Sequence, residues 1–165
     1  MSLKRHNGQL REFPHAHIYH VLLPVIFISF WVIDSQLFHL STILNSFVPF
    51  YIRIILAASI FIIALILILL SHRTLFKSHQ PPNILIKNGI LAYVRNPMYL
   101  GILLIYIAFI SFSISIICIG LFCFIFLIYN KMVNFEEKIL ENMFDEEYLN
   151  YKKKVSKWIP NPFKK

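Results

Sequence analysis

The stretch MYLGILLIYIAFISFSISIICIGLFCFIFLIYN, residues 98–130, is 33 residues long and contains no formal charge. An α-helix rises about 1.5 Å per residue, so this stretch would span roughly 50 Å. That length is too great for one bilayer crossing and sufficient for two short ones. The serine-rich patch at residues 111–115 is the natural place for a tight turn. The sequence therefore predicts a helical hairpin with spans at residues 98–112 and 115–130.

Two more apolar stretches precede this hairpin. Residues 18–33 include His20 and Pro24 and end near Trp31, an aromatic residue typical of the membrane interface. Residues 50–70 form the clearest span, with about 20 residues, enough for a hydrocarbon core of roughly 30 Å. Of the 165 residues, 58% are hydrophobic and 15% are charged. We therefore expect an all-α integral membrane bundle of about four transmembrane helices, forming a single domain over residues 1–165.

The net charge of +8 is distributed unevenly along the chain. Lys and Arg number three before the first span, none in residues 34–49, four in residues 71–97 and eight after residue 130. The positive-inside rule then predicts that both termini and the loop at residues 71–97 are cytoplasmic, a pattern that four crossings satisfy. Anionic lipid headgroups, rather than nucleic acid, are the expected counter-charge.

Several simple features argue against other classes of protein. Cys118 and Cys123 both lie in the uncharged stretch, where cysteine behaves as a small hydrophobic residue. Because no His or further Cys lies near them, neither a disulfide nor a metal site is predicted. The polar N-terminal stretch, which continues to about His17, does not fit a cleavable signal. His20 and His39 are expected to be interfacial or packing residues.

The segment after residue 130 has a different pattern. Apolar residues recur there at helical spacing as far as Tyr151, and six of the eight acidic residues lie between Glu136 and Glu147. This pattern predicts an amphipathic cytoplasmic helix that continues the last span. The tail, which ends at residue 165, mixes lysines with Trp158 and Phe163 and is expected to lie at the level of the lipid headgroups.

Three polar groups should meet on the cytoplasmic side of this bundle. They are the loop that contains His79, the corner RNPMY at residues 95–99, and the pair Glu136-Glu137. Since a hairpin returns the chain to the side it left, we expect Arg95 and Glu136 to be near neighbours. Polar residues next to a bilayer are costly, and where they cluster they usually bind a ligand or perform chemistry. Taken singly, each of these groups is also explained by contact with lipid or solvent.

The second half of the chain resembles the isoprenylcysteine carboxyl methyltransferases, a family of membrane enzymes, and the related phospholipid methyltransferases. The matching pieces are His79-Gln80-Pro81, LIKNG at 85–89, YVRNPMYLG at 93–101, Glu136-Glu137, and the helix end at 144–158. Two positions depart from the family's pattern. Leu91 replaces a frequent aromatic residue, and Phe135 replaces a frequent basic one.

The resemblance implies a membrane-embedded methyltransferase that uses S-adenosylmethionine, bound on the cytoplasmic side. It assigns catalytic roles to Arg95 and Glu136, and acceptor contacts to Arg95 and Lys131. The cofactor contacts that it implies are His79, Asn83, Ile84, Leu85, Ile86, Gly89, Tyr93, Asn96, Pro97, Tyr99, Glu136 and Glu137. The acceptor would be a lipid or prenyl-type molecule.

The chemistry of the acceptor stays open at this point. A carboxylate, as in isoprenylcysteine, is already anionic at pH 7 and needs no base, so Arg95 would only orient it. An amine headgroup arrives protonated and would need Glu136 or Glu137 to take a proton. We favour the carboxyl acceptor. An NADPH-dependent membrane reductase and a non-enzymatic membrane scaffold are the alternatives.

Overall fold

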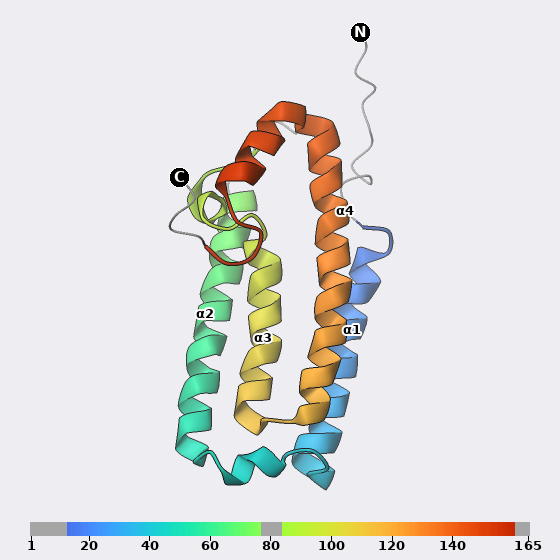
Figure 1. The fold of residues 1–165 in the computed structure, drawn as a ribbon, viewed down its shortest axis with the longest axis vertical. Coiled ribbons are helices and arrows are strands. Elements are labelled where there is room, and N and C mark those ends of the chain that lie inside the picture. The colour runs from blue at the N-terminus through green and yellow to red at the C-terminus, as the bar shows by residue number, and fades with distance from the viewer. Residues whose placement is uncertain (1–12, 77–83, 161–165) are drawn as a thin grey trace.

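The computed structural model describes residues 13–76 and 84–160, and the elements within these ranges are helical. The four long helices form an elongated bundle in which α3 packs along α2 and α4 packs along α1 (Figure 1). Their bounds are α1 Ala16–Val32, α2 Phe50–Phe76, α3 Pro97–Ser113 and α4 Ile116–Lys154. Three short helical segments connect them: η2 Ile33–Phe38, η3 Ile43–Ser46 and η4 Gly89–Ala92.

Among the residues that the structure describes, three helical stretches are long and apolar enough to cross a membrane: Ala16–Phe38, Phe50–Leu75 and Ile116–Lys154. The helix α3 is equally apolar in character but shorter. Large apolar side chains on the outside of the bundle are well exposed, and a monomer in water rarely presents so many of them together. The chain is therefore a helical membrane bundle, which confirms the fold class predicted from the sequence.

The helices extend beyond the predicted apolar stretches. The helix α1 begins at Ala16, and α2 continues to Phe76 through a polar turn that includes Arg73. A cation near the end of a helix interacts favourably with the helix dipole, so this turn can stay helical after the apolar residues end. The first part of the predicted loop at residues 71–97 is therefore the end of α2.

The hairpin between α3 and α4 turns at Ile114, inside the serine-rich patch. Ile114 has a left-handed conformation with φ 40°, which a β-branched residue rarely adopts. Ser115 then caps α4, because its hydroxyl accepts a hydrogen bond from the backbone N–H of Cys118 at 3.0 Å. At the other end of α3, Pro97 occupies the first helical turn, where its missing N–H costs nothing.

A buried carboxylate stabilises this turn. Asp34, which is 1% exposed, accepts hydrogen bonds from the backbone N–H and the hydroxyl of Ser41, at 2.8 and 2.7 Å, and from the hydroxyl of Ser115. On the neighbouring helix, Arg53 donates to the carbonyl of Phe112 at 2.7 Å, near the end of α3. No role was expected for Arg53, although a single cation at the start of an apolar helix is a visible signal. We call this part of the bundle the hairpin end.

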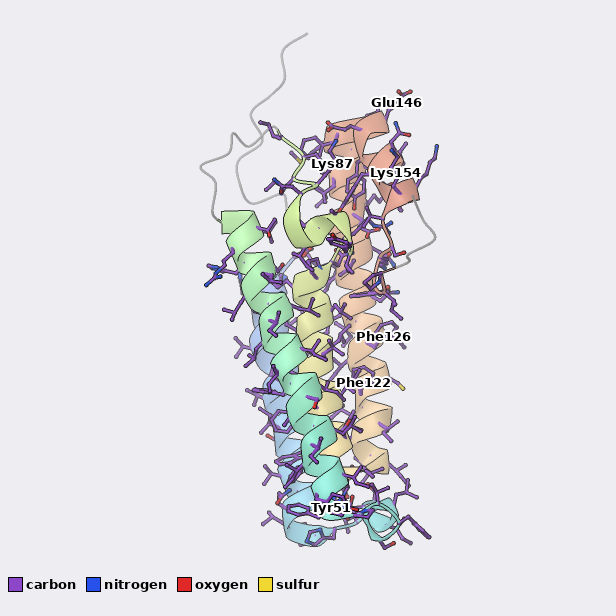
Figure 2. All side chains as sticks on the ribbon, turned by 90° about the vertical axis from the view of Figure 1, so that its left-hand side faces the viewer. Tyr51, Lys87, Phe122, Phe126, Glu146 and Lys154 are labelled. Atoms are coloured by element: carbon purple, nitrogen blue, oxygen red, sulfur yellow. The ribbon has the colours of Figure 1, made fainter. Side chains whose placement is uncertain are left out.

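The opposite end, which we call the polar end, is closed by the last part of α4. At Asp145 the backbone leaves helical geometry, with φ 44° and ψ −122°, and the chain reverses (Figure 1). The returning segment buries Tyr148 and Tyr151 together with Leu85 from the loop before α3. Lys87, Glu146 and Lys154 gather at this end, whereas Tyr51 lies at the hairpin end (Figure 2). The acidic and basic residues of the last segment are therefore close to the start of α3.

Candidate functional site

The centre of the polar end is a buried ion pair between Arg95 and Glu137. The Nε and Nη2 atoms of Arg95 donate to the two carboxylate oxygens of Glu137 at 3.0 and 3.2 Å. The Nη1 atom donates to the backbone carbonyls of Lys152 and Val155 at 2.9 and 2.7 Å. The two paired side chains are only 7% and 4% exposed. Arg95 thus ties the start of α3 to α4 and to the segment that follows the reversal.

The partner of Arg95 is Glu137, whereas we expected Glu136 to be its neighbour. Successive residues on a helix point about 100° apart, so only one of two adjacent glutamates can face the same neighbour. Glu137 also accepts from the side-chain amide of Asn96 at 2.9 Å, and the Nζ atom of Lys152 lies 3.7 Å from its carboxylate. Glu137 is therefore the structural member of the pair.

Glu136 faces a different set of residues. Its carboxylate accepts a hydrogen bond from the hydroxyl of Tyr99 at 2.5 Å. Both side chains are half-buried. The ring of Tyr99 in turn lies 5.7 Å from that of His20 on α1 and 5.8 Å from that of Tyr129 on α4, measured between centroids. The Tyr99–Glu136 pair therefore belongs to the side of α4 that faces α1 and α3.

An apolar groove begins beside this pair and continues into the bundle. It has a volume of about 340 Å³ and is lined by residues of α1, α3 and α4. His20 and Met98 belong to the lining, as do Phe27, Ile105 and Phe109. Charged side chains are absent from the lining, which is drawn from residues of the described ranges. His20, which we expected from the sequence to be an interfacial or packing residue, thus lines a groove that the sequence did not predict.

The loop before α3 is held against the reversed segment. Leu85 is buried with Tyr148, and the backbone carbonyl of Leu91 accepts from the hydroxyl of Tyr151 at 2.6 Å. Burial raises the pKa of Tyr151 to about 12, because the phenolate would be poorly solvated there. Lys87 forms an exposed ion pair with Glu147 at 2.6 Å.

The remaining residues of this loop differ in their surroundings. Gly89 has φ 60°, and a Cβ atom there would lie 2.9 Å from the hydroxyl of Thr74. Ile86 is half-buried, whereas Ile84 and Tyr93 are 53% and 66% exposed. His79 and Asn83, which we expected to contact a cofactor, lie outside the described residues.

A family model described as phospholipid methyltransferase matches residues 52–147. This range includes most of α2, all of α3, the corner at residues 95–99 and both glutamates. The chain belongs to the phospholipid methyltransferase family. No curated protein matches it.

Membership of this family makes the protein a membrane methyltransferase and favours that activity over the reductase and scaffold alternatives. The matched range excludes α1, so His20 and its side of the groove lie outside it. It also ends before the part of the reversed segment that binds Arg95. Those contacts are known from the structure alone.

The two positions that depart from the family pattern, Leu91 and Phe135, both make apolar contacts in this methyltransferase. Leu91 is buried at 7% exposure and anchors Tyr151 through its backbone. The ring of Phe135 packs edge-on against the ring of Phe13, which precedes the N-terminus of α1, with centroids 5.4 Å apart. Both positions therefore contribute apolar contacts between segments.

Two lysines near the site differ in accessibility. Lys131, expected to face the acceptor, is exposed on α4. Lys157, which the sequence analysis did not consider, donates to the side chains of Asn130 and Asn134. Burial lowers the pKa of Lys157.

Within residues 13–76 and 84–160, no group of three or more His, Cys, Asp or Glu side chains could hold a metal ion.

Proposed function

We propose that the protein transfers a methyl group from S-adenosylmethionine to the amine headgroup of a membrane lipid, at the Tyr99–Glu136 pair. One observation supports this assignment most strongly. A half-buried carboxylate, held by a phenol at 2.5 Å, lies at the head of an apolar groove that descends between α1, α3 and α4. This arrangement combines a proton acceptor with a path for a hydrocarbon chain.

The residues present suit this methyl donor. The donor is a sulfonium cation, and cations are attracted to carboxylates and to the faces of aromatic rings. Such groups lie together here, because Tyr99 directly contacts the carboxylate of Glu136 and the rings of His20 and Tyr129. Asn96 and the loop at residues 84–86 would contribute further polar and backbone contacts. When bound, S-adenosylmethionine supplies an electrophilic methyl group.

The protein's own residues would have three tasks. Glu136 takes one proton from the acceptor's ammonium group, because a protonated amine has no lone pair with which to react. Tyr99 holds the Glu136 carboxylate in one orientation, and the apolar wall of the groove excludes water. Arg95 is a positioning residue, since its ion pair with Glu137 fixes the start of α3 and hence Tyr99.

An amine acceptor fits this geometry better than the carboxylate that the sequence analysis favoured. That expectation relied on Arg95 to orient an anionic acceptor. In the structure four N–H groups of Arg95 are already directed at Glu137, Lys152 and Val155. An acceptor carboxylate beside Glu136 would also meet a like charge. The description of the matching family, phospholipid methyltransferase, points in the same direction.

We further propose that the polar end and both termini face the cytoplasm. Basic residues of the described ranges, among them Lys87, Arg95 and Lys154, lie at this end, as the positive-inside rule requires. A soluble methyl donor would then reach Glu136 directly from the cytoplasm, while the lipid would reach it from the bilayer.

Methyl transfer to defined acceptors tests this proposal. The purified protein would be incubated with methyl-labelled S-adenosylmethionine and vesicles that contain phosphatidylethanolamine, phosphatidylglycerol or a farnesylated cysteine derivative. We expect label in the phosphatidylethanolamine fraction only. Label in the prenylcysteine fraction would favour the carboxyl acceptor, and absence of label from every fraction would contradict the proposal.

A further inference from the structure

The wall of the groove contains two buried hydroxyl groups that lie close to each other and have no other hydrogen-bond partner among the residues that the structure describes. They belong to Tyr106 on α3 and Tyr129 on α4, whose side chains are 3% and 0% exposed. Both residues line the groove. A buried hydroxyl without a partner is destabilising, and most buried polar atoms in proteins are satisfied. A molecule bound in the groove that these residues line would supply an acceptor.

The two hydroxyls lie deeper in the bundle than the Tyr99–Glu136 pair. Tyr106 follows Tyr99 by two helical turns, which places it about 10 Å deeper along α3. Beside and beyond Tyr106 the lining is apolar and includes Phe27, Ile105 and Phe109. The order from the polar end inward is thus the Glu136 carboxylate, which is not part of the lining, then two hydrogen-bond donors of the groove wall, then hydrocarbon.

A glycerolipid has the same order of chemical groups. Its amine headgroup comes first, its ester carbonyls follow, and its acyl chains come last. A prenylated cysteine differs, since its thioether sulfur is only a weak acceptor and the prenyl chain that follows has none. The sequence of polarity along the groove therefore matches an ester-linked lipid.

We propose that this groove binds one acyl chain of the lipid acceptor, and that Tyr106 and Tyr129 donate hydrogen bonds to its ester carbonyl. This inference rests on the proposed function, because it takes the acceptor of that reaction as the occupant. The volume of about 340 Å³ is near the lower limit for ligand pockets, so it suits a single chain, with the rest of the lipid left in the bilayer.

Equilibrium binding without the methyl donor tests the inference. The ligands are phosphatidylethanolamine with two ester-linked chains and its analogue with two ether-linked chains of the same length, since ether oxygens are weaker acceptors. The proteins are the wild type, the Tyr106→Phe/Tyr129→Phe double variant and, as control, Tyr51→Phe at the exposed hairpin end.

We expect the wild type and Tyr51→Phe to bind the ester lipid about three- to tenfold more tightly than the ether lipid, the range of one or two ordinary hydrogen bonds. The double variant should bind both lipids equally. Its thermal midpoint should not fall, because the substitutions remove buried hydroxyls that lacked other partners. This second measurement separates a loss of recognition from a loss of folding.

Two results would overturn the inference: equal binding of the ester and ether lipids by the wild type, or an ester preference that survives in the double variant. Lipid bound only around the outside of the bundle would give the first result. If the ester preference is present but no lipid is methylated, the groove assignment stands and the proposed function fails. If ester and ether lipids are bound and methylated equally well, the function stands and the inference fails.

Discussion

Replacement of Glu137 by Gln should destabilise the protein much more than the same replacement of its neighbour Glu136. Glu137 is the buried partner of Arg95, and both paired side chains are less than a tenth exposed. The Glu137→Gln substitution keeps the size of the side chain and removes its charge. The guanidinium of Arg95 would then stay buried beside a neutral amide.

The expected size of this effect follows from the geometry. Removing one member of a buried ion pair typically costs about 3–5 kcal/mol, because the other charge is left uncompensated. The second carboxylate contact, from Lys152 at 3.7 Å, is lost as well. Glu136→Gln removes the charge of a half-buried carboxylate that accepts one hydrogen bond from Tyr99, which predicts a loss of about 0.5–1.5 kcal/mol.

Unfolding of the two purified variants in mixed micelles, followed by tryptophan fluorescence as denaturing detergent is added, measures this difference. Trp158, which packs against Phe126 beside the reversed segment, provides the signal at the relevant end of the molecule. Because the substitutions are identical and the residues adjacent, each variant is the control for the other. Equal free energies of unfolding for the two variants would refute the division of roles within the glutamate pair.

Three further predictions concern the scaffold. Gly101→Leu should lower the free energy of unfolding by about 1–3 kcal/mol in the same assay, since even a Cβ atom would lie 2.6 Å from Ile68; wild-type stability would contradict the close approach of α2 and α3. Asp34→Asn should cost about 1–3 kcal/mol, because the amide keeps only one of the two acceptor oxygens that Ser41 and Ser115 use; a thermal midpoint equal to the wild type would exclude this role. The pKa of Tyr151 is about 12 in the folded state and about 10 in the unfolded state. The stability that the protonated Tyr151 contributes is therefore complete below pH 10 and is lost as the pH rises through 12. Between pH 9 and 11 the wild type should therefore lose more stability than Tyr151→Phe, and an equal loss would count against the assignment.

Much of the fold was accessible from the sequence because hydrophobicity determines it. Long apolar stretches must be helical in a bilayer, since every backbone polar group needs a partner within its own segment. The uncharged stretch at residues 98–130 was too long for one crossing, and the turn at Ile114 lies within the serine-rich patch. The return of the chain then brought Glu137 to Arg95.

The details of the site were less accessible. Which glutamate meets Arg95 depends on the rotation of α4 about its own axis, which the sequence pattern does not fix. The reversal at Asp145, a non-glycine residue with positive φ, also leaves no clear sequence signal. The contact between His20 and Tyr99 depends on how α1 packs, which local pattern does not fix. Tyr106 and Tyr129 did carry a signal, since polar groups inside apolar spans are often functional.

The most direct test of the account is the rate of methyl transfer to phosphatidylethanolamine by the Glu136→Gln variant at saturating S-adenosylmethionine. Lys138→Gln, an exposed position two residues further along α4, is the matched control. A carboxylate that accepts the proton of the reacting amine should be worth about 100-fold or more in kcat, so we predict a loss of at least that size for Glu136→Gln and none for Lys138→Gln. A Glu136→Gln variant that is folded and transfers methyl groups within twofold of the wild-type rate would contradict the account.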